Sequence, residues 1–211
     1  LLEDHPYIQT PHPLRCALGP HHAGACDYYL QDLEDTIQKL GPENIAALVA
    51  EPINGSSGGA ITPPEGYWQA AHKILQRHGI LLIMDEVMTG FGRTGVAFGS
   101  QLYDVAPDLM VAGKGLAGGY AAIAGVFGRE DIANAISESG FNVMFHTFGA
   151  LPQSCAAATA VLKILREENL VQRAGGIGQK TLEGLKGTIG QQPNVAEIRG
   201  AGTLIGIESV R

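Results

Sequence analysis

Short apolar runs that lead into charged residues are the feature that most restricts the fold of this chain. Three such runs are followed by an ionisable side chain: AALVA at 46–50 before Glu51, ILLIM at 80–84 before Asp85, and LMVA at 109–112 before Gly113-Lys114. Runs this short and this apolar, with helical segments between them, are typical of buried parallel strands. The carboxyl ends of parallel strands meet at one edge of a sheet, where ligands gather. The pattern therefore predicts that the three charged side chains share one edge of an α/β sheet.

The segments between and after these runs have the apolar spacing of helices. We expect helices over 31–40, 62–78, 152–165 and 170–185. Thr62 and Glu65 have the spacing of a capping box at the start of the second helix. Further strands are expected at 123–127 and 203–207. This alternation predicts a mostly parallel sheet covered by helices on both faces.

The composition excludes several classes of protein. Hydrophobic residues make up 45% and charged residues 17% of the 211 residues, which rules out intrinsic disorder. The net charge of −7 argues against nucleic acid as a partner, and no apolar run is long enough to cross a membrane. Cys16, Cys26 and Cys155 are odd in number and lack metal-site spacing, which favours a reducing, cytoplasmic location. The adjacent His21 and His22 have no flanking carboxylates, so we expect no metal site.

The two ends of the sequence suggest a fragment of a longer protein. The chain starts with LLEDHPYIQT, which lacks an initial Met, and stops with GIESVR directly after a strand-like run.

Lys114 and Asp85 admit two chemical interpretations. An apolar strand followed by Asp85-Glu86 resembles the Mg²⁺ site of P-loop NTPases, but Lys114 is followed by Gly115, and GK[ST] is absent from the sequence. A pyridoxal phosphate (PLP) site needs an amine for a Schiff base and a carboxylate to keep the pyridine nitrogen protonated. Lys114 and Asp85 supply both, 29 positions apart. From spacing alone, Lys114 fits an exposed turn as well as a ligand-facing position.

Several motifs together resemble the class III aminotransferases. The matching segments are, in order, EPINGSSGGAITPPEGY (51–67), IMDEVMTGFGRTG (83–95), PDLMVAGKGLAGGY (107–120), HTFGALPQSCAAA (146–158) and RGAGTLIGIE (199–208). The resemblance extends from about residue 46 to the end of the chain. It implies the fold of the type I PLP enzymes. Residues 1–165 would form the central and C-terminal part of the PLP-binding large domain, and 166–211 a connecting helix and the start of a smaller C-terminal α+β domain.

The resemblance also implies roles for five residues. Lys114 would carry the PLP Schiff base and move the substrate proton, and Asp85 would pair with the pyridine nitrogen. Val87 would pack on the cofactor ring, and Thr147 would reach the cofactor phosphate of a partner subunit. Glu51 would pair with a mobile arginine near the substrate carboxylate. On the residues alone, Val87 also fits ordinary core, Thr147 a turn or helix cap, and Glu51 a solvated loop.

Two of the departures from the family pattern concern the cofactor and substrate site. Met88 stands where many members have a glutamine that bonds the cofactor's ring oxygen, and a thioether cannot donate that bond. The family's phosphate-binding loop would lie before residue 1, and its substrate-switching arginine after Arg211.

The function that the resemblance implies is transamination. An amine or ω-amino acid would give its nitrogen to a 2-oxo acid, in a homodimer that binds neither nucleic acid nor membrane. Two alternatives stay open: a PLP-dependent aminomutase or racemase on the same scaffold, and an inactive truncated remnant that only dimerises or binds a partner.

Overall fold

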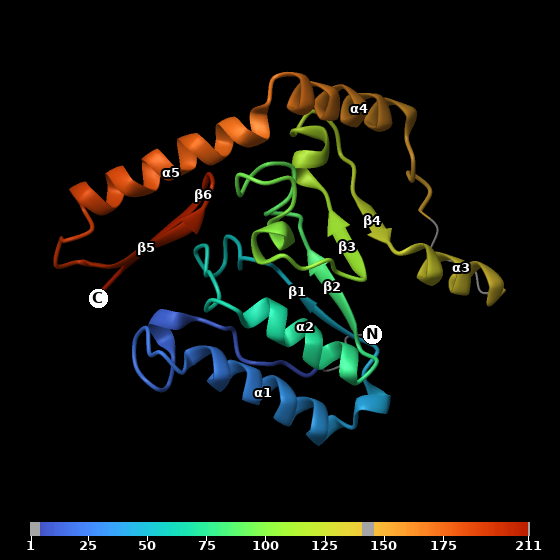
Figure 1. Cartoon of the computed structure of the whole chain (residues 1–211). Coiled ribbons are helices and arrows are strands. Elements are labelled where there is room, and N and C mark those ends of the chain that lie inside the picture. The colour runs from blue at the N-terminus through green and yellow to red at the C-terminus, as the bar shows by residue number, and fades with distance from the viewer. Residues whose placement is uncertain (1–4, 141–145, 211) are drawn as a thin grey trace.

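A four-stranded sheet forms the centre of the computed structural model, which describes residues 5–140 and 146–210 (Figure 1). Its strands follow the order β1 (Ala47–Ala50), β2 (Leu81–Asp85), β3 (Leu109–Ala112) and β4 (Gly125–Gly128). β1, β2 and β3 are parallel, whereas β4 runs antiparallel to β3. The expected α/β class with a mostly parallel sheet is confirmed.

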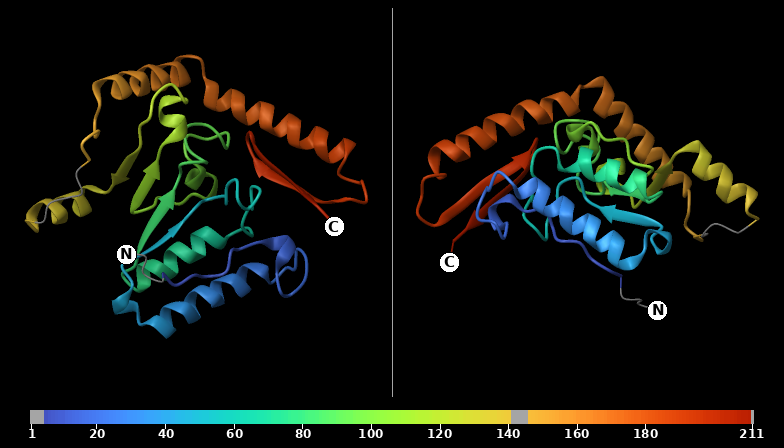
Figure 2. Two further views of the ribbon diagram at one scale, coloured as in Figure 1. Left: turned by 180° about the vertical axis from the view of Figure 1, so that it is seen from behind. Right: turned by 60° about the horizontal axis from the view of Figure 1, so that its bottom comes forward.

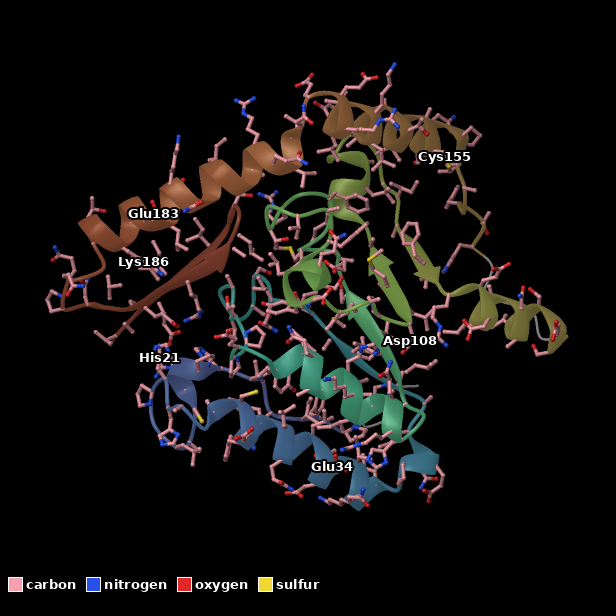
Figure 3. All side chains as sticks on the ribbon, viewed as in Figure 1. His21, Glu34, Asp108, Cys155, Glu183 and Lys186 are labelled. Carbon is pink, nitrogen blue, oxygen red and sulfur yellow. The ribbon has the colours of Figure 1, made fainter. Side chains whose placement is uncertain are left out.

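Two helices, α1 (Ala25–Leu40) and α2 (Tyr67–Arg77), lie side by side along one face of the sheet. The main core is built from apolar side chains of these helices and of β2: Tyr29, Leu33, Ile37, Trp68, Ala71, Leu75, Leu82 and Met84. Glu34 of α1 points toward α2, where it accepts hydrogen bonds from Arg77 and His78, each at 2.8 Å (Figure 3). These hydrogen bonds join α1 to the C-terminal end of α2, beside the apolar core.

The opposite face of the sheet is more open. Alternation along the strands turns Val49, Ile83 and Asp85 away from α1 and α2. Val49 is 62% exposed, and Val126 of β4 is 68% exposed. Within residues 5–140 and 146–210, the helical layer expected on this face does not cover these two side chains.

Two helix starts differ from the sequence-based expectation. α1 begins at Ala25 rather than near residue 31. α2 begins at Tyr67, and the capping box of Thr62 and Glu65 does not form, because Thr62 instead donates to the carbonyl of Ala60 at 3.3 Å. The two prolines after Thr62 favour extended backbone before them, so the helix starts only after Gly66, which has φ +79°.

The last part of the chain forms two long helices and a hairpin (Figure 2). α4 (Pro152–Glu167) leads into α5 (Leu170–Thr188), and α5 packs against a hairpin of β5 (Val195–Ala201) and β6 (Leu204–Ser209). β5 and the short helix α3 (Glu130–Glu138) were not expected from the sequence. The proposed domain boundary at 165/166 falls just before the end of α4 and stays a prediction.

Short 3-10 helices complete the described structure: η1 (Pro13–Arg15), η2 (Pro42–Asn44), η3 (Gly99–Tyr103) and η4 (Lys114–Ala117). Cys16, Cys26 and Cys155 are free thiols. Among the described residues, none of the helices has both the length and the apolar character needed to cross a membrane.

Candidate active site

The carboxyl ends of the three parallel strands bring Glu51, Asp85 and Lys114 to one edge of the sheet. Ala50 pairs with Met84, so the residues that follow them, Glu51 and Asp85, lie on neighbouring chain segments. Asp85 pairs in turn with Val111, three positions before Lys114. The three strand ends that carry these residues therefore meet at one edge of the sheet, as the sequence predicts.

Lys114 begins η4, separated from the end of β3 by Gly113 alone, in a strained backbone conformation. Its φ is +37°, in a region that side-chain-bearing residues rarely adopt. A side chain at the following residue, Gly115, would place its Cβ 3.0 Å from the Cβ of Phe91. The glycine is thus explained by close packing, and the turn presents the lysine to solvent.

The amine of Lys114 contacts a thioether rather than a carboxylate. Its Nζ lies 2.7 Å from the Sδ of Met88, and in the described part of the chain it forms no ion pair. Lys114, Met88 and the half-buried Val87 line one pocket of about 420 Å³. Met88, which the sequence marked only as a departure from the family, is thus a direct neighbour of the amine.

Asp85 and Glu51 line a second pocket, of about 400 Å³. Asp85 accepts a hydrogen bond from the Val87 amide through Oδ1, at 3.0 Å. Glu51 accepts one from the Gly55 amide through Oε2, at 2.8 Å. Burial raises the pKa of Glu51; the Gly55 hydrogen bond opposes the rise, the Asp85 charge adds to it, and the Lys114 charge opposes it. The pKa of Glu51 is therefore sensitive to both other site residues.

Glu86, the neighbour of Asp85, has a structural role that the sequence analysis did not assign. Its side chain is fully buried and accepts hydrogen bonds from the amides of Gly99 at 2.7 Å and Ser100 at 2.8 Å, and from the Thr89 hydroxyl. These bonds hold the first turn of η3. Successive side chains of a strand point to opposite faces, which is the signal that could have separated the two acids.

Thr147 is not brought to the other predicted site residues. It lies on an exposed turn before α4, and neither of the two pockets includes it among the described residues. Its predicted role in a partner subunit's site stays a prediction. In the same described ranges, no group of three His, Cys, Asp or Glu side chains could hold a metal ion.

Fold and site together define an α/β enzyme scaffold with a lysine and an aspartate at adjacent strand ends. The family model for class III aminotransferases matches residues 3–211, and the chain belongs to this family.

Relatives and solved structures agree with this assignment. An uncharacterised aminotransferase of Sinorhizobium fredii is 37% identical over 98% of this chain and 47% of its own length. The putrescine–pyruvate aminotransferase of Pseudomonas aeruginosa is 40% identical over 86% of this chain and 40% of its own length. The crystal structure of an (S)-enantioselective ω-transaminase from Thermomicrobium roseum has a TM-score of 0.92 and 38% identity, covering 99% of this chain and 47% of that chain. The chain thus spans about half the length of the relatives it matches.

Proposed function

We propose that the whole protein is a PLP-dependent transaminase that moves an amino group from an amine or ω-amino acid to a 2-oxo acid. The observation that carries the proposal is the grouping of Lys114, Asp85 and Glu51 at one sheet edge, within a chain of the class III family. A transaminase from an uncultivated Pseudomonas species, 38% identical with a TM-score of 0.92, is described in a PLP-bound form.

The residues present fit this cofactor. The Lys114 amine has no carboxylate partner among the described residues, so it is available for a covalent bond to an aldehyde carbon. Asp85 accepts the Val87 amide hydrogen bond through Oδ1, so its Oδ2 is left to accept a hydrogen bond from a protonated pyridine nitrogen. When bound, PLP would supply an electron sink for the carbon that loses its proton.

The chain's own residues would bind the cofactor, move the substrate proton and orient the substrate. Asp85 would pair with the ring nitrogen and favour its protonated form, and the Lys114 amine would take and return the substrate proton as a base. Val87 bounds the pocket beside the lysine. Glu51 would serve the substrate side, and Thr147 would reach the cofactor phosphate of the partner in a homodimer. We place this protein in the cytoplasm, in keeping with its three free thiols.

Borohydride trapping tests the site directly. The whole protein is incubated with PLP, reduced and digested, and the adduct is located by mass spectrometry. We expect the label on Lys114, with little on the exposed Lys163 and Lys186. A Lys114→Arg variant, which keeps the charge but cannot form the adduct, should lose this label. Equal labelling of all lysines in the unmodified protein would refute the assignment of Lys114.

The reaction class is tested on the whole protein with PLP, without the reduction and digestion. An amine substrate should be consumed in repeated turnovers only when a 2-oxo acid is added, since the nitrogen needs an acceptor. Turnover without the oxo acid would assign the site to an aminomutase or racemase instead. Labelling of Lys114 without any turnover would favour a binding role.

A further inference from the structure

The Glu51 carboxylate is held by a loop formed from the residues that follow it. This loop, residues 54–61, is closed by reciprocal backbone hydrogen bonds between Asn54 and Ile61, at 3.0 and 3.1 Å. Inside it, the amides of Gly59 and Ala60 donate to the carbonyl of Gly55 at 3.0 and 3.2 Å. The amide of Gly55 then donates to Glu51 at 2.8 Å. The place of the carboxylate therefore depends on the place of the loop.

Arg199, on β5, reaches this loop from the distant end of the chain. Its Nε donates to the carbonyl of Gly59 and its Nη2 to that of Gly58, both at 3.1 Å. Its Nη1 pairs with Glu197 at 2.6 Å and with Glu208 at 2.5 Å. Arg199 is buried, with 8% of the residue exposed, and its planar guanidinium can donate to several acceptors in fixed directions.

The backbone of the hairpin also approaches the loop closely. A Cβ at Gly206 of β6 would lie 2.0 Å from the carbonyl oxygen of Gly59. Leu204 of β6 packs with Ile53 and Ala60, and Met88, the neighbour of Lys114, packs against the same small cluster. Arg199 thus adds directed hydrogen bonds to an apolar contact that extends to the site.

We propose that Arg199 is a positioning residue, which holds loop 54–61 and thereby sets the Glu51 carboxylate relative to Asp85 and Lys114. The path consists of Arg199 to the Gly58 and Gly59 carbonyls, the loop's internal bonds to Gly55, and the Gly55 amide to Glu51. The role of Glu51 toward substrate rests on the proposed function. The test below uses neither cofactor nor substrate, so its failure would leave the proposed function untouched.

The test is the titration of Glu51 followed by ¹³C NMR, with the resonance assigned through a Glu51→Gln variant. Arg199→Lys keeps a positive charge beside Glu197 and Glu208, but one ammonium cannot replace the planar fork. Released from Arg199, the loop should admit water, so the pKa of Glu51 should fall toward its ordinary value, because burial is the main cause of its rise. The Gly55 amide should exchange with solvent about tenfold faster.

Arg15→Gln is the matched control. Arg15 of η1 also pairs with Glu208, yet its described hydrogen bonds do not reach loop 54–61. This variant should leave the Glu51 titration and the Gly55 exchange unchanged. An unchanged Glu51 in Arg199→Lys, or an equal change in Arg15→Gln, would overturn the proposal.

A measurement on the unmodified protein covers the case in which Arg199→Lys does not fold. If Arg199 holds the loop, its Nε–H and the Gly55 amide should exchange with similar opening free energies. A Gly55 amide that opens while the Arg199 Nε–H stays protected would overturn the proposal in the same way.

Discussion

At the scale of the single residue, the adjacent acids Asp85 and Glu86 at the end of β2 point in opposite directions and differ in burial. Asp85 stays half-buried and faces the site, with one oxygen bonded to the Val87 amide. Glu86 turns the other way and is fully buried, with amide and hydroxyl donors around its carboxylate. A buried charge is tolerated there because its donors replace water.

Glu86→Gln should therefore destabilise the protein without removing a group from the site. The amide nitrogen of the new side chain would face N–H donors, so we expect the free energy of unfolding to fall by roughly 1.5–3 kcal/mol. Urea denaturation gives this quantity, and Glu65→Gln, at an exposed position, should change it by less than about 0.5 kcal/mol. Equal stability of the two variants would show that the buried carboxylate is not needed to hold η3.

At the scale of the element, α5 shows how tertiary packing can outweigh the low helix propensity of glycine. The helix contains several glycines, which on propensity alone weaken it. Gly178 is buried, and a Cβ there would lie 1.9 Å from the carbonyl oxygen of Gly202, in the turn between β5 and β6. At Gly184, on the same helix, a Cβ would meet no atom within 4 Å. Of these two glycines, only Gly178 is required by the contact with the hairpin.

The two alanine substitutions should shift stability in opposite directions. Gly184→Ala should raise the free energy of unfolding by about 0.5–1 kcal/mol, because alanine is the better helix former. Gly178→Ala should lower it by about 1–3 kcal/mol, since the helix must move away from the hairpin. Urea denaturation of both variants measures the difference. Stabilisation by Gly178→Ala would mean that α5 does not pack on the hairpin as described.

At the scale of the whole molecule, a cluster of charges joins the N-terminal segment to the C-terminal hairpin. His12 lies 3.4 Å and His21 3.6 Å from carboxylates of Glu208 and Glu197 respectively, and Figure 3 shows His21 beside the hairpin. Burial by itself raises the pKa of Glu208, but hydrogen bonds from Arg199 and Arg15 outweigh it and bring the pKa to about 2. Burial, and then the charge of Arg199, lowers the pKa of His12.

Both shifts predict that the protein loses stability as the pH falls. A carboxyl whose pKa is lower in the folded state stabilises above its ordinary pKa, here 4.5, and this contribution is lost as the pH falls toward about 2. A histidine with a lowered pKa likewise opposes folding once the pH falls below its ordinary value of 6.5. We expect the melting temperature to decrease from pH 7 to pH 3, and Glu208→Gln to reduce the decrease below pH 4.5. A Glu208→Gln profile parallel to that of the unmodified protein would contradict this.

Much of the fold could be predicted because its signals are local. The strands at 47–50, 81–85 and 109–112, and the start of α4 at Pro152, lie at or within a residue of the expected places. The start of α2 could not be placed by its capping-box spacing, since the intervening prolines and Gly66 decide where the chain turns. β5 was missed because its pattern is interrupted by Arg199 and Gly200, which only their partners explain.

The sequence by itself determined the family and the α/β class and named the candidate residues of the site, because apolar runs, glycines and charged strand ends are local features. The tertiary structure decided what each polar side chain faces. It placed Met88 against the amine of Lys114, buried Glu86 under η3, and joined Arg199 to the loop that holds Glu51. The last contact crosses 141 positions of sequence. No local pattern encodes such a contact, since it exists only once the hairpin has packed against the loop.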